Sequence, residues 1–492
     1  MKYIIPQDNL WRFSVNAIEW ANTEFDGADL GDKRLNDRLI KITGQFLSSS
    51  QSPINQACGG WADTKAAYRF FQNENVNYKD IVGHHAQSTK KRFDNEDVIL
   101  AIQDTTYFNY TDHPKTKGLG ILSRFTGKYK KDIITSGLYM HTTMAVNADG
   151  LPLGLLDQKI TAREVLAKEK IELKKRTHNI ALPIEEKESI RWLDAMRASA
   201  SLFENQQKRV VTVADREADI YDLFLLAEEL GTHYLIRASH NRKINKSAIH
   251  SEITGEMLWD FMGKQKIEGE IQVNVPAKDE HPKRVATCTV KIGTIKLLPP
   301  RNFKGSKEIS KELTIYSVQV EEINPPKGVS KIDWILHTNI PIHCYEDAME
   351  KVKWYCLRWR IEIFFKVIKS GFNVERCRLE TADRLIRYLA IISIVAWRVF
   401  WLTLVSRTAS GGLSSEFLSE DEWKVLFVRF NPAKKIPKRP PSLRKVTMWI
   451  AQLGGFLARK GDGSPGITHI WRGLKKLADM MEGMRIYGHI CG

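Results

Sequence analysis

Two aspartates in this sequence stand where a metal ion could use them. Asp104 lies just after the apolar run VILAI, and Asp215 follows the apolar run VVTVA. A buried carboxylate without a partner is costly, so an acid at the end of a buried strand needs a compensating group. Magnesium is one candidate, because it binds a few carboxylates together with water and phosphate oxygens. Either residue could instead cap a helix or a turn, which is the interpretation we favour for Asp219.

A third carboxylate, Glu362, lies in the segment KWYCLRWRIEIFFKVIKSG. Steps of three and four place it on one helical face with Tyr355, Arg358, Lys366 and Lys369. A carboxylate among cations suits a metal ligand beside groups that contact DNA phosphates. Three carboxylates could hold two metal ions, which activate the attacking oxygen and neutralise the leaving oxygen of a phosphodiester. A ladder of helix salt bridges, at about 0.2 to 0.5 kcal/mol per pair, is the alternative that spacing leaves open.

The segments around these carboxylates follow the order of a ribonuclease H-like core, namely three antiparallel strands, helix, strand, helix and strand. Runs rich in strand-forming residues predict strands at 97–110, at 141–160 as a pair around a turn at 147–150, at 209–214 and from 232. A strand at 333–339 and a long helix at 345–371 complete the core. Strands and helices thus bring the three carboxylates toward one place.

We therefore predict an α/β protein with three domains, which suits a chain of 492 residues. The ribonuclease H-like catalytic domain occupies residues 96–375 and contains a β-rich insertion at about 241–331. A helical domain precedes it at residues 1–95. A second helical domain follows it at residues 376–492. We expect the chain to be helical after residue 371 through 405, and the last helices to lie at 446–460 and 467–484.

Composition indicates a polyanionic partner and a reducing compartment. The 74 Lys and Arg residues exceed the 58 Asp and Glu residues, which gives a formal net charge of +16 and favours nucleic acid. The six cysteines form no C-x-x-C pair, so neither a disulfide framework nor a structural zinc site is indicated. Residues 1–13 do not resemble a secretory signal. The apolar stretch 388–405 is interrupted by Arg398 and predicts a buried helix rather than a membrane span.

These motifs resemble the insertion-sequence-four family of bacterial DDE transposases, and within that family the transposon-five type. Tyr355, Arg358, Glu362 and Lys369 meet the family signature YxxRxxxExxxxxxK in full. The other matching segments occur in the family's order and cover nearly the whole chain: DTT at 104–106, DREADI at 215–220, EEINPPKG at 321–328, LGGF at 453–456 and PGITHIWRG at 465–473.

The resemblance implies cut-and-paste DNA transposition of an insertion sequence. Asp104, Asp215 and Glu362 would bind two divalent ions, normally Mg²⁺, with Mn²⁺ as a possible substitute. One strand at the transposon end is nicked by water, and the freed 3′-hydroxyl attacks the opposite strand to form a hairpin. The hairpin is then reopened, and the same 3′-hydroxyl joins target DNA.

The resemblance also implies contacts with the transposon end. Tyr355, Arg358 and Lys369 would hold its phosphate, with Arg237 beside them. Trp334 would stack on a base flipped out near the cut, since an indole replaces lost stacking with little sequence preference. For an isolated Trp in a strand, a core position is the alternative.

The flanking domains would supply binding and assembly. The N-terminal domain would recognise the inverted-repeat end, with candidate contacts at Lys33, Arg34, Arg38 and Arg69. The C-terminal helices would form a homodimer in the synaptic complex, in the bacterial cytoplasm. Two other functions remain open at this point. A host nuclease would cut without joining, and a DNA-binding regulator would occupy ends without cutting, although it would have no use for the carboxylates.

Overall fold

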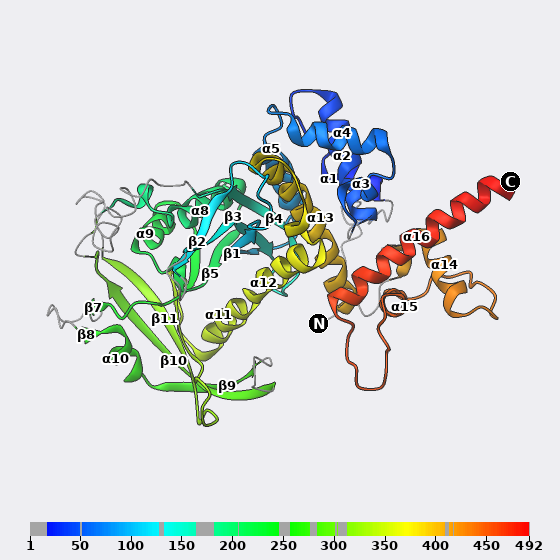
Figure 1. The fold of residues 1–492 in the computed structure, drawn as a ribbon. Coiled ribbons are helices and arrows are strands. Elements are labelled where there is room, and N and C mark those ends of the chain that lie inside the picture. Colours follow the sequence, from blue (N-terminus) through cyan, green and yellow to red (C-terminus); the bar gives the residue numbers. More distant parts are fainter. Residues whose placement is uncertain are drawn as a thin grey trace.

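The computed structural model describes residues 17–49, 52–126, 132–163, 182–204, 206–245, 256–275, 283–300, 303, 312–408, 413–416 and 418–491. Residues 1–13, in which we expect no secretory signal, lie outside the described residues. Figure 1 shows a helical N-terminal part, a central sheet with helices against it, and a helical C-terminal part. The predicted three-part α/β architecture is confirmed.

The N-terminal part consists of short helices, as predicted. They are α1 (Ala17–Glu24), α2 (Lys33–Ser48), α3 (Ile54–Ala57), α4 (Trp61–Gln72) and α5 (Tyr78–Lys91). Helix α2 begins after Asp32, whose side chain accepts a hydrogen bond from the Arg34 backbone N–H, a common helix cap. Its apolar face buries Leu39, Ile42 and Phe46. Helix α5 packs on the central sheet at strand β4.

The centre of the sheet has the ribonuclease H-like order β4–β3–β1–β5–β6. The strands are β1 (Val98–Asn109), β3 (Asp132–Val146), β4 (Pro152–Thr161), β5 (Arg209–Ala214) and β6 (His233–Arg237). Strand β3 pairs antiparallel with both β1 and β4, while β1, β5 and β6 are mutually parallel. The predicted strand order is therefore confirmed.

Other elements complete this centre. Helix α8 (Ile190–Phe203) precedes β5, and helix α9 (Tyr221–Glu229) connects β5 to β6. The predicted turn at 147–150 joins β3 to β4, with Gly150 N–H bonded to the Asn147 carbonyl at 2.9 Å. Strand β2 (Gly120–Thr126), which the sequence pattern did not predict, pairs with the first half of β3.

The β-rich insertion is confirmed, and its strands continue the central sheet. Strand β12 (Asp333–Thr338) pairs with β6 on one side and with β11 on the other. The insertion contains β7 (Lys243–Asn245), β8 (Glu256–Met257), α10 (Leu258–Gly263), β9 (Ile267–Val275), β10 (Arg284–Leu297) and β11 (Leu313–Glu322). Among the residues that the structure describes, the result is one 12-stranded sheet.

The single helix predicted at 345–371 is wrong in detail. Helix α11 (Tyr345–Leu357) ends before Arg358, α12 (Trp359–Lys366) follows, and the π-helical turn η4 (Val367–Gly371) ends the segment. Around Arg358 the hydrogen bonds tighten to a three-residue spacing, because Ile361 N–H bonds to the Arg358 carbonyl at 3.1 Å. Such 3₁₀ and π irregularities inside helices occur often at functional sites.

The expectation of continuous helix after residue 371 is also wrong. A short 3₁₀ turn, η5 (Val374–Arg376), precedes helix α13 (Ala382–Thr408). Thr381 forms a β-bridge with Lys117, and the Ala382 N–H bonds to the Lys117 carbonyl at 2.8 Å. This pairing holds the chain extended until α13 begins.

Helix α13 is a core helix, as predicted. Residues 382–405 are long and apolar enough to cross a membrane, but 94% of an 18-residue apolar stretch of this helix is buried inside the protein. Figure 1 shows α13 lying between the N-terminal helices and the rest of the molecule. Packing against both parts explains why the helix is apolar on all sides.

The C-terminal part contains α14 (Glu420–Phe430), α15 (Leu443–Leu453) and α16 (Ile467–Cys491). We predicted a helix from Val446 to Lys460, but α15 ends at Leu453 because Gly454 and Gly455 follow, and Gly455 has φ +94°. Helix α16 continues past the predicted end at Met484. Its distal end projects from the molecule (Figure 1).

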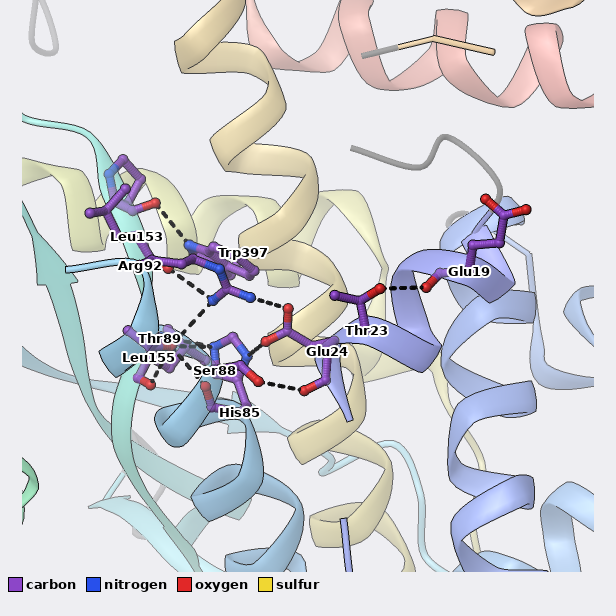
Figure 2. Close-up of polar contacts among 11 residues, drawn as sticks. Glu19, Thr23, Glu24, His85, Ser88, Thr89, Arg92, Leu153, Leu155 and Trp397 are labelled. Atoms are coloured by element: carbon purple, nitrogen blue, oxygen red, sulfur yellow. Dashed lines mark hydrogen bonds and ion pairs between the residues drawn. The ribbon is translucent and has the colours of Figure 1, made fainter. Parts of the chain in front are cut away.

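A buried polar cluster joins α1 to α5, β4 and α13 (Figure 2). Glu24 forms an ion pair with Arg92, and its Oε1 lies 2.5 Å from His85 Nδ1. His85 Nε2 accepts from the Leu155 N–H at 2.9 Å, so its Nδ1 carries the proton donated to Glu24. The Arg92 guanidinium lies 4.5 Å from the centroid of the Trp397 ring. The N-terminal helices are thus attached to the catalytic sheet through a hydrogen-bonded ionic network.

Candidate active site

Asp104 and Asp215 occupy equivalent positions on neighbouring parallel strands. Ile102 of β1 pairs with Val213 of β5, and each aspartate lies two residues further along its strand direction. Neighbouring strands are about 4.8 Å apart, so Asp104 and Asp215 lie side by side at the carboxyl end of β5. Asp104 Oδ1 accepts from the Thr105 N–H at 2.7 Å. The sequence prediction that the two strands bring these acids together agrees with this register.

Asp215 stands at the point where β5 turns into a 3₁₀ turn, η3 (Arg216–Ala218). Its Oδ1 accepts from the Glu217 N–H at 2.9 Å, so Asp215 also caps η3. The cap that we considered as an alternative to a metal site is therefore present. One oxygen makes the capping bond, and a carboxylate can accept further bonds or bind a cation through its other lone pairs.

Arg358 connects the third carboxylate to the first. Its Nη1 lies 3.2 Å from Asp104 Oδ2, and its Nη2 lies 2.6 Å from Glu362 Oε1. The Arg358 side chain is only 14% exposed, so water screens these contacts weakly. The helix salt bridge that spacing predicted between Arg358 and Glu362 exists. The same guanidinium also reaches Asp104 on the central sheet.

The three carboxylates interact electrostatically. Burial raises the pKa of Asp104 from 3.8 to about 6; the Thr105 N–H and Arg358 oppose the rise, while Asp215 and Glu362 add to it. A carboxylate whose pKa is raised by burial and by neighbouring acids becomes more readily ionised when a cation is bound nearby. Burial is the main cause of the raised pKa of Asp104, and Arg358 offsets only part of it.

The three carboxylates fit a divalent ion by their chemistry, but Arg358 bonds to two of them. Three carboxylates from β1, the end of β5 and α12 are the oxygen ligands that Mg²⁺ prefers. Within the described ranges, no group of three His, Cys, Asp or Glu side chains is already arranged around a common metal position. The Arg358 guanidinium bonds to Asp104 and Glu362, and it takes the place of a cation between them. A metal ion at these residues requires Arg358 to release its carboxylate contacts.

Tyr355, Trp334 and Arg237 form one wall beside the carboxylates. The Trp334 and Tyr355 ring centroids are 5.7 Å apart at 60°, and the Arg237 guanidinium lies 5.9 Å from the Trp334 ring. Arg237 Nη2 donates to the Asp333 carbonyl at 3.1 Å, and burial lowers its pKa. Trp334 is half-buried. One part of the indole packs on Tyr355, as a core Trp would, while another part remains accessible, as stacking on a flipped base requires.

Lys369 belongs to the π-helical turn η4, on the same side of the sheet as Phe108. Its Nζ lies 5.8 Å from the Phe108 ring centroid, and burial lowers the pKa of the lysine. Glu375 partly offsets that effect and also accepts from the Asn109 N–H at 2.8 Å. Lys369 is therefore a half-buried cation beside the end of β1, whereas Lys366 is exposed.

The N-terminal candidate contacts lie on two helices. Lys33, Arg34 and Arg38 are on α2, and Arg69 is on α4. Lys33 pairs with Asp37 at 2.9 Å with both side chains largely exposed, and such pairs are weak. Because α2 and α4 belong to the N-terminal part, the four cations lie apart from the strands and the helix that carry the carboxylates. A separate DNA-contacting domain requires such an arrangement.

These cations differ in whether a carboxylate already balances their charge, and the carboxylate of Asp63 lies near Arg38. Its Oδ1 lies 3.3 Å from Arg38 Nη1 and 2.7 Å from Lys41 Nζ. Arg34 and Arg69 are exposed, and in the described part of the chain neither forms an ion pair. Arg34 and Arg69 thus have more unbalanced charge to offer a phosphate than Arg38 has.

Two further residues lie near the site: Asp219, which we interpreted from the sequence as a cap, and Arg191, which the sequence analysis missed. Asp219 is buried and accepts from the Ser239 and His240 N–H groups at 2.7 and 3.0 Å, and it pairs with Arg242 at 2.7 Å. These bonds hold the pKa of Asp219 well below its usual range despite burial. Asp219 fixes the loop after β6. Arg191 of α8 bonds to Thr105 and Glu217, which lie next to Asp104 and two residues after Asp215, and no local sequence pattern indicates it.

Comparison with protein families agrees with this arrangement. Residues 17–76 match the transposase DNA-binding family, residues 190–398 match the transposase DDE domain, and residues 394–490 match the transposase Tn5 dimerisation domain. The DDE match includes Asp215 and Glu362. A ribonuclease H-like core with converging carboxylates and these three matches defines an enzyme of DNA transposition.

The chain belongs to the Tn5-type DDE transposases. DNA and a second copy of the same chain are its partners, since DNA-binding and dimerisation domains are both present. Enzymes of the DDE family use divalent metal ions. The resemblance inferred from the sequence is therefore confirmed at the level of family and enzyme class.

Proposed function

We propose that this chain catalyses cut-and-paste transposition of an insertion sequence, with Asp104, Asp215 and Glu362 holding two Mg²⁺ ions. When bound, the ions would supply activation of the attacking oxygen and neutralisation of the leaving oxygen. The observation that carries the proposal is the convergence of the three acids: Asp104 and Asp215 lie two residues beyond a pair of neighbouring strand positions, and Arg358 contacts both Asp104 and Glu362, at 3.2 and 2.6 Å. Mn²⁺ would replace Mg²⁺ at the same ligands.

The cations and aromatic residues around the carboxylates would position the transposon end. Arg358 would exchange its bonds to Asp104 and Glu362 for bonds to a DNA phosphate, because a guanidinium binds both anions in the same two-pronged geometry. Lys369, Tyr355 and Arg237 would hold the same phosphate. Trp334 would stack on a flipped base through the part that does not pack on Tyr355.

This positioning supports the hairpin route. A duplex end must distort before its 3′-hydroxyl can reach the opposite strand, and stacking on Trp334 would lower the cost of the distortion. The same carboxylates would then serve nicking, hairpin formation, reopening and joining to target DNA.

The other domains would complete the reaction. We assign residues 1–95 to binding of the inverted-repeat ends through Lys33, Arg34, Arg38 and Arg69, residues 96–375 to catalysis, and residues 376–492 to dimerisation in a synaptic complex. The protein would act in the bacterial cytoplasm, associated with the nucleoid through DNA.

The test is cleavage of a linear duplex that carries the gene's own flanking inverted repeats, in the presence of Mg²⁺. We expect hairpin-ended and joined products from the native protein and none from Glu362→Ala. Glu346→Ala is the matched control, because Glu346 is an exposed acid on α11. Mg²⁺-dependent cutting without end specificity or joining would identify a nuclease instead. Tight end binding without products would identify a regulator.

A further inference from the structure

Arg191, the second residue of α8, has a buried side chain that bonds to two different segments of the active site. Its Nε donates to Thr105 Oγ1 at 3.1 Å, and its Nη2 donates to Glu217 Oε2 at 2.9 Å. A third bond, from Nη1 to the Glu188 carbonyl at 2.9 Å, fixes the guanidinium to its own helix start. The Arg191 side chain is 9% exposed. One planar group thus spans β1 and the turn after β5.

The two residues whose side chains bond to Arg191, Thr105 and Glu217, also donate backbone hydrogen bonds to the two aspartates. The Thr105 N–H donates to Asp104 Oδ1 at 2.7 Å, and the Glu217 N–H donates to Asp215 Oδ1 at 2.9 Å. The same arrangement therefore occurs twice. Arg191 bonds to a side chain, and the backbone N–H of that residue bonds to a carboxylate oxygen.

A buried hydrogen-bonded chain fixes the Thr105 end of this arrangement. His141 Nδ1 lies 2.9 Å from Thr105 Oγ1, and its Nε2 lies 3.3 Å from Gln103 Oε1. Burial and the nearby Arg191 hold the pKa of His141 well below its usual range, so the ring is neutral. With the proton on Nε2, His141 accepts from the Thr105 hydroxyl, which leaves that oxygen free to accept from Arg191. Every bond in the chain then has one donor and one acceptor.

We propose that Arg191 is a positioning residue that fixes the separation and orientation of Asp104 and Asp215, and thereby sets the affinity of this pair for a divalent cation. The inference rests on the proposed function, in which these two aspartates are metal ligands. Groups that orient metal ligands typically change metal affinity by about 10- to 100-fold when removed. A lysine would not replace Arg191, because an ammonium is a point charge without the rigid fork that reaches both partners.

The test is Mn²⁺ binding to the full-length chain, measured by electron paramagnetic resonance of the free ion. We expect Arg191→Met to raise the Kd for Mn²⁺ about tenfold and Arg191→Lys to recover little of that loss. Arg197→Met is the matched control. Arg197 lies on the same helix, is 47% exposed and pairs with Asp194 at 3.3 Å, and its removal is expected to leave the Kd unchanged.

A second variant separates positioning from loss of the folded state. Thr105→Val removes the hydroxyl that accepts from Arg191 but keeps the backbone N–H that bonds to Asp104, and we expect it to raise the Kd severalfold. Thr105→Val should remain folded, with thermal unfolding at a lower temperature because Arg191 and His141 each lose a buried hydrogen bond, and its binding of end DNA should change little. A Kd within twofold of the native value for both Arg191→Met and Thr105→Val would overturn the inference.

The metal site itself is checked in the same experiment with Asp104→Asn. If the native chain binds Mn²⁺ and Asp104→Asn does not, unchanged binding in the Arg191 variants overturns only the positioning role. If Asp104→Asn binds Mn²⁺ as the native chain does, the proposed metal site fails, and the role of Arg191 fails with it.

Discussion

Asp104 Oδ2 lies 3.2 Å from Nη1 of Arg358, although 254 residues separate the two in the sequence. The contact joins the central strand of the sheet to the broken helix that carries Glu362. It also shows how the protein balances charge before a metal ion or a DNA phosphate is bound. The ion pair offsets only part of the cost of burying Asp104. Burial still raises the pKa of Asp104 to about 6, with Asp215 and Glu362 adding to the rise.

The first prediction concerns the pH dependence of stability. The pKa of Asp104 rises from 3.8 to about 6 on folding, so the folded state binds its proton more tightly than the unfolded chain does. The cost of ionisation is therefore absent below about pH 4, grows as pH rises toward 6, and reaches about 3 kcal/mol above that. In EDTA, Asp104→Asn should raise the free energy of unfolding at pH 7.5 and have little effect at pH 4.

Urea unfolding at the two pH values measures this effect, and added Mg²⁺ supplies the control. Mg²⁺ should stabilise the native chain at pH 7.5 but not Asp104→Asn. An Asp104→Asn variant that is less stable than the native chain at pH 7.5 in EDTA would contradict the inferred cost of ionising Asp104 in its buried position.

The second prediction concerns the buried cluster in Figure 2. Arg92 and His85 hold the pKa of Glu24 at about 2 against the effect of burial, which alone would raise it. The folded pKa lies below the usual 4.5, so this contribution is present above about pH 4.5 and is lost as pH falls toward 2. Removing one partner of a buried pair leaves the other charge uncompensated, and Glu24→Ala should cost about 3 to 5 kcal/mol at pH 7.

Chemical denaturation at pH 7 checks this value. Glu19→Ala is the matched control, since Glu19 is an exposed acid on the same helix, and its effect should stay within about 0.5 kcal/mol. Equal effects of the two substitutions would show that the ionic network does not attach α1 to the sheet.

The third prediction separates the two interpretations of Trp334. If the indole stacks on a flipped base, Trp334→Ala should slow hairpin formation about tenfold or more while the first nick continues, because base stacking contributes about 1 to 3 kcal/mol. Fluorescence of 2-aminopurine placed near the cut reports the flipped base directly. Trp259→Ala, at an exposed Trp of α10, is the control. A purely structural Trp334 would affect nicking and hairpin formation equally.

The sequence predicted the parts of this site that depend on local patterns. Asp104 and Asp215 follow apolar strands, and Glu362 lies in a helical stripe of cations, so local patterns make all three candidates, and the family's motifs and their order select them from the other acids. The break at Arg358 and the π-helical turn were not predictable, because they arise from packing against distant segments. Arg191 illustrates the same limit. Its bonding partners Thr105 and Glu217 are 86 and 26 residues away, and no periodicity connects such positions.

The fourth prediction concerns the contact between the π-helical turn and the C-terminal part. A Cβ atom added to Gly371 would lie 1.3 Å from Cη2 of Trp471, the indole that also packs on Phe372 at 5.3 Å between ring centroids. Gly371→Ala should therefore lower stability by about 1 to 3 kcal/mol through overpacking. Gly371→Ala combined with Trp471→Leu should recover part of the loss. Differential scanning calorimetry measures both, and a neutral Gly371→Ala would mean that α16 moves freely from this turn.

The last prediction concerns the N-terminal DNA contacts and their dependence on salt. A protein with net charge +16 that binds DNA through phosphates should lose affinity steeply between low and moderate salt, and each phosphate contact contributes about 0.9 to the logarithmic slope. Arg69 is exposed on α4, whereas Arg38 already pairs with Asp63 at 3.3 Å. Arg69→Gln should therefore reduce the salt slope by about one, and Arg38→Gln should reduce it by less. Fluorescence anisotropy of a labelled end duplex at several KCl concentrations measures the slopes. A flat response in the native protein would remove the phosphate-binding role, while a larger change in Arg38→Gln than in Arg69→Gln would show that the Asp63 ion pair opens when DNA binds.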